Sequence, residues 1–224
     1  MTAAAYDALL LDHDGVVVTL AAKSALRTAT VGAFADAGIA APRSEDVDSL
    51  TISVSPAELR TVAARYDVDP DTLWRCREDR IDSTLRNATE AERKRPYDDV
   101  AALDGVGVPM GIVSNNQTRI IEYVLETYGL DSLVETIRAR APTRESLRKK
   151  KPEPTYLEAA AADLGCSNPL YVGDSESDIV AGNRAGFDAV FLRRRHNADA
   201  QLAAEPYAEA ASLEAVAELV PSSN

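Results

Sequence analysis

The sequence predicts an α/β protein in which helices cover both faces of a parallel β-sheet and an all-helical domain is inserted after the first strand. Short apolar segments that fit buried strands alternate with segments of helical spacing over most of the chain. The stretch after the first strand differs, because it contains helix and loop patterns but no convincing strand. We therefore expect residues 1–19 and 96–224 to form the α/β domain and residues 20–95 to form the helical one.

The α/β domain is predicted to begin with the apolar segment 6–12, which is followed by a glycine-containing turn. Several of the later helical segments end at a glycine, as helices commonly do. Later strands are expected at 108–114, 132–140, 169–174 and 188–192, and helices at 118–129, 153–165, 177–186 and 212–220. This alternation is typical of a parallel sheet, since neighbouring parallel strands need a crossover connection.

Helical segments make up the predicted inserted domain. Apolar residues recur at helical spacing over 21–38, a segment that ends at Gly38. Ser55 followed by Pro56 is a favourable helix start, because serine caps helix N-termini and proline suits the first helical position. A further helix is expected over 69–87.

The composition indicates a globular protein of the cytoplasm. Hydrophobic residues make up 46% of the chain and charged residues 27%, which are ordinary proportions. The sequence has no apolar run of membrane-spanning length and does not start with a basic segment followed by an apolar one. We therefore expect no membrane association and no secretion.

The charge balance is strongly acidic. Thirty-six acidic and 24 basic residues give a formal net charge of -12, which is poorly suited to binding the phosphates of nucleic acids. The acid excess, scarce lysine and abundant alanine resemble the composition of proteins from extreme halophiles. The arginines at 193–195 are expected to form a solvated surface run.

Polar residues gather where the predicted strands end. Loops that follow neighbouring parallel strands converge on one edge of a sheet, where ligands of such proteins bind. These clusters can therefore meet although they are distant in sequence. They are Asp12 with Asp14, Ser114 with Asn115 and Asn116, Lys151 at the start of a helix, and Asp174 with Asp178.

Two carboxylates interrupt the apolar stretch "LLLDHDGVVV". In extended backbone, Asp12 and Asp14 would face one way and His13 the other. Side-by-side carboxylates repel one another unless a cation or a shared proton intervenes. A solvated turn is the alternative interpretation of this pair.

The four clusters together favour phosphoryl transfer. Adding Asp174 to the first pair makes an oxygen-rich site that suits Mg²⁺. Lys151 and Ser114 would then face an anion held by the metal, as phosphoryl transfer requires. Capping of a helix is the alternative role of Asp174 and Asp178.

These residues resemble, in order, the four motifs of the haloacid dehalogenase-like superfamily of hydrolases. The motifs correspond to "LLLDHDGV", "GIVSN", "KPEP" and "YVGDSESDIVAGNRAG". The helical insertion is similar to the helical cap of the phosphoglycolate phosphatase and β-phosphoglucomutase branch. The resemblance implies a Rossmann-like α/β core with an inserted helical cap domain.

The resemblance also implies a Mg²⁺-dependent phosphatase that hydrolyses small phosphomonoesters through an aspartyl-phosphate on Asp12. Asp14 would act as general acid and then as general base. By the same resemblance, the catalytic residues are Asp12, Asp14, Ser114 and Lys151, the phosphate is bound by Ser114, Asn115 and Lys151, and Mg²⁺ is held by Asp12, the backbone carbonyl of Asp14 and Asp174, with Asp178 in support.

Three other functions remain open at this point. A phosphomutase would pass the phosphoryl group between positions of a sugar, and a 2-haloacid dehalogenase would attack carbon without a metal. A non-catalytic binding module on the same scaffold is the third. The expected partner is a small phosphorylated metabolite, and the protein is expected to be a monomer or a homodimer.

Overall fold

A six-stranded parallel sheet forms the centre of the α/β part of the molecule. The computed structural model describes residues 5–222, and the sheet has the strand order β3-β2-β1-β4-β5-β6. The strands are β1 (Ala8–Leu11), β2 (Met110–Gln117), β3 (Thr136–Arg140), β4 (Pro169–Gly173), β5 (Asp188–Leu192) and β6 (Ala208–Ala210). The predicted fold class is confirmed. The edge strand β6 was not predicted, because its three residues, Ala-Glu-Ala, are too few to show a strand pattern.

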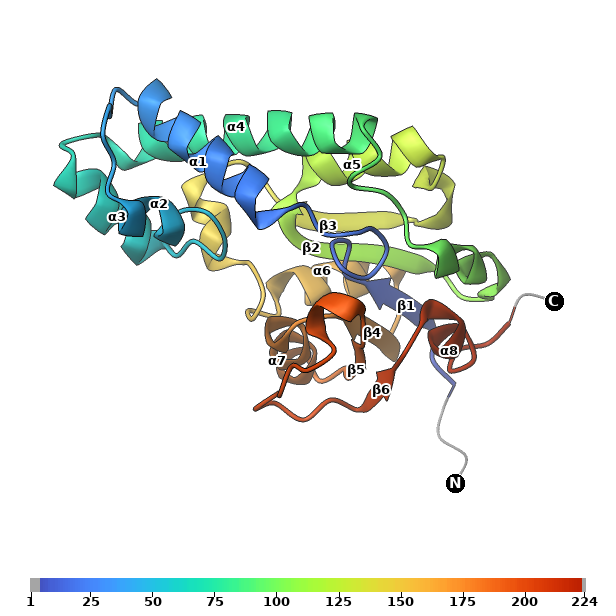
Figure 1. Cartoon of the computed structure of the whole chain (residues 1–224). Coiled ribbons are helices and arrows are strands. Elements are labelled where there is room, and N and C mark those ends of the chain that lie inside the picture. Colours follow the sequence, from blue (N-terminus) through green and yellow to red (C-terminus); the bar gives the residue numbers. More distant parts are fainter. Residues whose placement is uncertain (1–4, 223–224) are drawn as a thin grey trace. The chain divides into compact units, whose positions relative to one another are not determined.

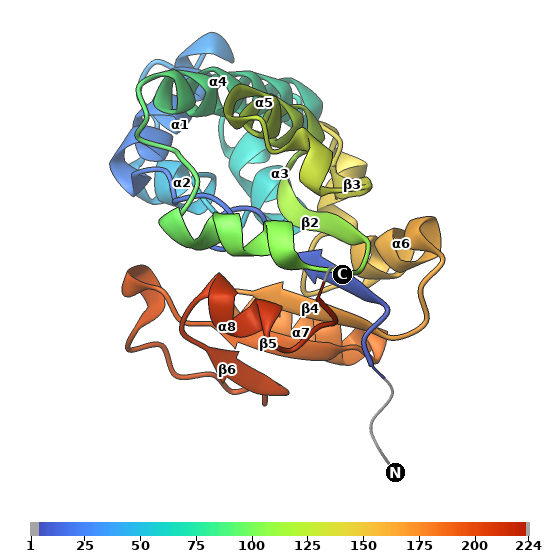
Figure 2. The same cartoon turned by 90° about the vertical axis from the view of Figure 1, so that its right-hand side faces the viewer.

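Helices cover both faces of this sheet. The helical elements are η1 (Asp98–Gly105), α5 (Thr118–Tyr128), η2 (Asp131–Leu133), α6 (Thr155–Leu164), α7 (Glu176–Ala185), η4 (Arg195–Asn197) and α8 (Leu213–Ala217). On one face, α6 packs on β1 and β2 while α7 packs on β4 and β5 (Figure 2). On the other face, η1 and α8 pack against one another.

The central strand β1 carries the first polar cluster. It pairs with β2 and β4, so that Leu9 lies opposite Met110 on one side and Leu170 on the other. All four side chains of β1 are fully buried, which explains why this strand is a continuous apolar run without alternation. Asp12 follows directly at the carboxyl end of the strand.

The chain folds into two compact units. The α/β unit consists of the chain up to Thr19, Arg95–Ala139 and the chain from Lys149 onward. The helical unit consists of Leu20–Lys94 and Arg140–Arg148. The chain therefore passes from one unit to the other at four points.

The helical unit has a core of its own. Its elements are α1 (Lys23–Asp36), α2 (Ser44–Ser49), α3 (Pro56–Arg65), α4 (Pro70–Glu90) and η3 (Arg144–Arg148). The helices α1 and α4 run side by side (Figure 1). The buried residues include Phe34, Leu59 and Trp74, and Leu147 from the second segment packs with them. The short helix α2 was not predicted, because only one of its six residues is apolar.

Local sequence signals account for the helix boundaries. Ser55 caps α3, since its Oγ accepts a hydrogen bond from the Glu58 amide at 3.2 Å and the Glu58 carboxylate accepts one from the Ser55 amide at 2.9 Å.

Within residues 5–222, no helix has the length and apolarity needed to cross a bilayer.

Candidate active site

The loop after β1 places Asp12 and Asp14 differently from an extended strand. The chain turns at Gly15, whose φ is +85°, and the amides of Val17 and Val18 both donate to the His13 carbonyl. The expectation that His13 faces away from both carboxylates is wrong, because its buried ring brings Nδ1 to 3.4 Å from Asp14 Oδ2. The strand alternation does not apply, since β1 ends before these residues.

Gly15 also allows the loops after β1 and β4 to approach one another. A Cβ at this position would clash with the Asp174 carboxylate, which lies directly against the glycine. Positive φ and close approach both require glycine here. The first and fourth sequence clusters therefore meet.

Three carboxylates converge at the carboxyl ends of β1 and β4. Ligand oxygens of Asp12, Asp174 and Asp178 all lie within 4.8 Å of one another. The side chain of Asp178 is fully buried, and those of Asp12 and Asp174 are 12% and 10% exposed. An all-oxygen set of negatively charged ligands fits a hard divalent cation such as Mg²⁺.

Lys151 is the cation of this cluster. Its Nζ lies 2.9 Å from Asp12 Oδ1 and 2.6 Å from Asp178 Oδ1, and the side chain is 2% exposed. It also donates hydrogen bonds to the Val113 carbonyl at 3.0 Å and to the Tyr171 hydroxyl at 2.9 Å. One ammonium offsets only one of three carboxylates, so the cluster keeps an excess of negative charge when all are ionised.

The burial of this cluster shifts its ionisation. Desolvation raises the pKa values of Asp12 and Asp174, although Lys151 partly opposes the rise at Asp12 and His196 partly opposes it at Asp174. Burial alone would lower the pKa of Lys151, but Asp12 and Asp178 outweigh it and raise that pKa. Lys151 is therefore a permanent cation at neutral pH.

Asp178 supports the cluster and caps a helix at the same time. Its Oδ1 contacts Lys151 and accepts a hydrogen bond from the Tyr171 hydroxyl at 2.7 Å. Its Oδ2 accepts from the amide and the hydroxyl of Ser175, which forms a capping box at the start of α7. Burial raises the pKa of Asp178, but Lys151 and these hydrogen bonds outweigh it and lower that pKa.

The end of β2 contributes a serine and two asparagines. Ser114 is buried, and its Oγ accepts a hydrogen bond from the Asn116 amide at 3.2 Å. The Asn115 side chain binds the backbone of Lys151 on both sides, donating to its carbonyl at 3.0 Å and accepting from its amide at 2.7 Å. Asn116 Nδ2 donates to Asp14 Oδ2 at 2.9 Å. The second, third and first clusters are thus linked through asparagine side chains.

Sequence reasoning missed Tyr171, whose hydroxyl connects Lys151 to Asp178. The signal in the sequence is a tyrosine within an otherwise aliphatic strand, at the first position of the fourth motif. Its ring is fully buried among apolar residues, so the hydroxyl reaches the site from within the core.

The loop after β5 was also misread. Arg193 and Arg195 are partly or fully exposed, as expected for a surface run, but the Arg194 side chain is 10% exposed. Arg194 pairs with both oxygens of Asp99 at 2.6 and 3.0 Å and donates to the Val16 carbonyl at 2.9 Å. It therefore braces the loop that carries Asp12. The position of this loop at the carboxyl end of a strand was the available signal.

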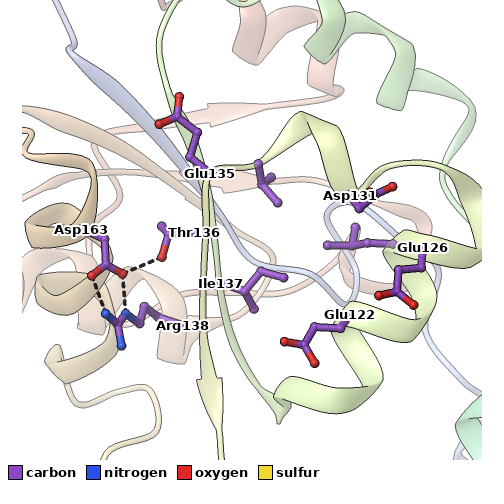
Figure 3. A pocket seen from close by; sticks show the side chains of 10 residues that line it. Glu122, Glu126, Asp131, Glu135, Thr136, Ile137, Arg138 and Asp163 are labelled. Atoms are coloured by element: carbon purple, nitrogen blue, oxygen red, sulfur yellow. Dashed lines mark hydrogen bonds and ion pairs between the residues drawn. The ribbon is translucent and has the colours of Figure 1, made fainter.

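A pocket elsewhere in the α/β unit has a different character from the carboxylate cluster. This pocket of about 410 Å³ lies beside α5 and β3, and Figure 3 shows the carboxylates of Glu122, Glu126 and Glu135 around it. Its one arginine, Arg138, is paired with Asp163. The excess of carboxylates makes this pocket unsuitable for a phosphate group.

Residues 50–192 match the family model of the haloacid dehalogenase-like hydrolases, which is more than half of the chain. The protein belongs to this family. The matched range includes the second, third and fourth sequence clusters, whereas Asp12 and Asp14 precede it.

Curated relatives include phosphoglycolate phosphatases. The protein of Neisseria gonorrhoeae (strain ATCC 700825 / FA 1090) is 36% identical over 98 residues, which are 41% of this chain and 40% of that protein. The protein of Escherichia coli (strain K12) is 30% identical over 102 residues, or 45% of this chain and 39% of that protein. The matches thus span about two-fifths of the length of these relatives.

Solved structures share the fold over nearly the whole chain. A putative phosphoglycolate phosphatase from Lactobacillus plantarum has a TM-score of 0.68 and 19% identity, and the match covers 96% of this chain and all of that one (100%). CbbY from Rhodobacter sphaeroides in complex with phosphate has a TM-score of 0.68 and 16% identity, with coverage of 93% and 95%. These structures establish the common fold.

Proposed function

We propose that the protein is a Mg²⁺-dependent phosphatase of small phosphorylated metabolites that acts through an aspartyl-phosphate on Asp12. The observation that carries this proposal is the meeting of Asp12, Asp174, Asp178 and Lys151 at the carboxyl ends of the central strands. Membership of the hydrolase family and the similarity to phosphoglycolate phosphatases support the reaction class.

Asp12 is suited to be the nucleophile because its two oxygens differ. Oδ1 accepts a hydrogen bond from the His13 amide at 2.7 Å and lies 2.9 Å from Lys151 Nζ. Oδ2 accepts no hydrogen bond from any of residues 5–222. In the proposed first step, an Asp12 oxygen bonds to phosphorus while the bond from phosphorus to the ester oxygen breaks.

Asp14 is suited to proton transfer because it is more accessible than Asp12. Its side chain is 24% exposed and is oriented by the Asn116 amide. In the proposal, Asp14 gives its proton to the departing alkoxide and later removes one from the water that attacks the aspartyl-phosphate. That second step releases phosphate and restores the Asp12 carboxylate.

Phosphate binding is assigned to three groups. Lys151 supplies a fixed positive charge beside the nucleophile, and Ser114 and Asn115 lie at the end of the neighbouring strand β2. Hydrogen-bond donors and a cation at this edge would offset the charge on the equatorial phosphoryl oxygens.

The metal is assigned to the side chains of Asp12 and Asp174 and to the backbone carbonyl of Asp14, with Asp178 in support. Bound Mg²⁺ would offset the excess negative charge of the cluster and polarise the phosphoryl group. We further propose that residues 20–95 act as the cap that selects the substrate, and that the protein works in the cytoplasm, as a monomer or a homodimer.

Phosphate release from a panel of small phosphomonoesters tests this function. We expect release with Mg²⁺ and none with a chelator, and no release by an Asp12→Asn variant that remains folded. The assay is to be run at low and high KCl because of the acidic composition. An isomeric sugar phosphate in place of free phosphate would indicate a mutase. Binding of Mg²⁺ without turnover on any substrate would indicate a binding module.

A further inference from the structure

The loop after β5 contacts Asp174, one of the residues to which the metal is assigned. We propose that His196 is a positioning residue that fixes the Asp174 carboxylate for a divalent cation. The affinity of the site for the cation then depends on an imidazole that none of the four sequence motifs contains. This inference rests on the proposed metal site.

The contact itself is short and direct. His196 Nε2 lies 2.6 Å from Asp174 Oδ2, and the two side chains are 27% and 10% exposed. A hydrogen bond of this length to a carboxylate that is nearly buried restricts its rotation. His196 thereby selects one orientation of the Asp174 carboxyl group.

The same short loop also holds the backbone of Asp174. Asn197 Nδ2 donates to the Asp174 carbonyl at 2.8 Å and to the Leu192 carbonyl at 3.0 Å, and Asn197 is 8% exposed. The Asn197 side-chain oxygen accepts a hydrogen bond from the Arg194 amide at 2.7 Å. The turn η4 is therefore fixed to the end of β5, and His196 reaches Asp174 from a rigid support.

The two oxygens of Asp174 are left with different roles. Oδ2 is enclosed between His196 and the backbone of Gly15, where any side chain would clash with it. Oδ1 accepts no hydrogen bond from residues 5–222. The arrangement thus reserves Oδ1 for a cation.

His196 acts through Asp174 and is not a ligand in this arrangement. The ligand atoms that lie within 4.8 Å of one another come from Asp12, Asp174 and Asp178. Residues that orient a metal ligand by hydrogen bonding typically contribute about 10- to 100-fold to metal affinity. We expect an effect of that size here.

The test is a binding titration of the full-length protein with Mn²⁺, followed by the electron paramagnetic resonance of the free ion, and with Mg²⁺ by calorimetry. His196→Ala should weaken binding about 10- to 100-fold. His196→Gln retains an N–H donor and should recover part of the loss. Arg195→Ala is the matched control, because it removes a charge from an exposed residue of the same turn. We expect its affinity to equal that of wild type.

Activity provides a second readout. In His196→Ala, the Mg²⁺ concentration for half-maximal rate should rise, while kcat at saturating Mg²⁺ should stay near that of wild type. Wild-type affinity in a folded His196→Ala variant would overturn the inference and leave the proposed function intact. An equal loss in Arg195→Ala would also overturn it, because charge alone would then explain the effect. A wild-type protein that binds no divalent cation would overturn the proposed metal site together with this inference.

Discussion

Each unit has, among residues 5–222, a buried cluster of charge, and the two clusters are built in opposite ways. In the α/β unit, three carboxylates surround the single ammonium of Lys151. In the helical unit, Arg77 and Arg140 flank Glu78, and both guanidinium groups lie over the Trp74 ring at 5.0 and 5.2 Å. One cluster has an excess of negative charge and the other an excess of positive charge.

The two clusters differ in how that excess is matched. Arg77 donates to the Leu50 carbonyl at 3.1 Å and to the Thr51 carbonyl at 2.8 Å, so backbone oxygens and an aromatic face surround the extra positive charge. At the carboxylate cluster, Oδ2 of Asp12 and Oδ1 of Asp174 accept no hydrogen bond from residues 5–222. A buried charge is costly unless it is paired. We therefore infer that the arginine cluster stabilises the helical unit, whereas the carboxylate cluster, with its unpaired oxygens, is suited to binding a cation.

The largest effect is expected from a substitution in the carboxylate cluster. Asp12→Asn should lower kcat by about four orders of magnitude or more, because the nucleophile is lost. The variant should nevertheless melt at a temperature at or above that of metal-free wild type at pH 7. The pKa of Asp12 is raised in the folded state, so its ionised form opposes folding and the asparagine removes that cost. Phosphate release and thermal unfolding check this. A large fall in melting temperature would show that the carboxylate cluster is structural after all.

The second largest effect is expected from a substitution in the Arg77–Glu78–Arg140 cluster. Glu78→Gln should lower the free energy of unfolding by about 3–5 kcal/mol, because two buried guanidinium groups lose their counter-charge. Urea denaturation measures this change. Glu92→Gln, at an exposed position just after the same helix, is the control and should change it by less than about 0.5 kcal/mol. Equal stability of the two variants would contradict the structural role of the Arg77–Glu78–Arg140 cluster.

A smaller effect is expected from Tyr171→Phe, which sharpens the comparison within the carboxylate cluster. The buried ring keeps its packing, while Lys151 and Asp178 lose the hydroxyl between them. We expect kcat/KM to fall about tenfold and the free energy of unfolding to fall by about 1 kcal/mol. Steady-state kinetics and urea denaturation measure the two quantities. Unchanged kinetics would mean that the hydroxyl has no part in holding Lys151.

The smallest effect concerns the molecule as a whole. With a formal net charge of -12, repulsion among surface charges opposes the compact state, and salt screens it. The melting temperature should therefore rise by several degrees as KCl increases into the molar range. Thermal unfolding at several KCl concentrations checks this. A melting temperature that is independent of salt would contradict the halophile-like interpretation of the composition.

Much of the fold could be predicted, because buried strands and helix ends have recognisable local sequence patterns. The continuous apolar run of β1 and the Ser55 cap of α3 are both readable within a few residues. The helix α2 is too short and too polar to be marked in this way, and the strand β6 is too short. The packing of Leu147 in the helical unit depends on residues far away in sequence, so no local pattern shows it.

The residues of the candidate site also fall into a group that could be predicted and a group that could not. Asp12, Lys151, Asp174 and Asp178 could be expected together, because each stands at a strand end or a helix start in a recognisable motif. Tyr171 is the first residue of the fourth motif, but nothing in that motif shows that its hydroxyl contacts Lys151, and His196 lies outside all four motifs. The sequence therefore does not show the side chains that contact and orient Lys151 and Asp174.

The division of the helical unit into two chain segments bears on how the protein is made and on how it can be rebuilt. Glu78 emerges from the ribosome long before Arg140, and Leu147 follows later still. The helical unit therefore completes its core only after the strands β1, β2 and β3 have been synthesised. A graft that exchanges residues 20–94 alone would leave 140–148 without the helices on which it packs. Designers who exchange this unit between proteins of the family need to move both segments together.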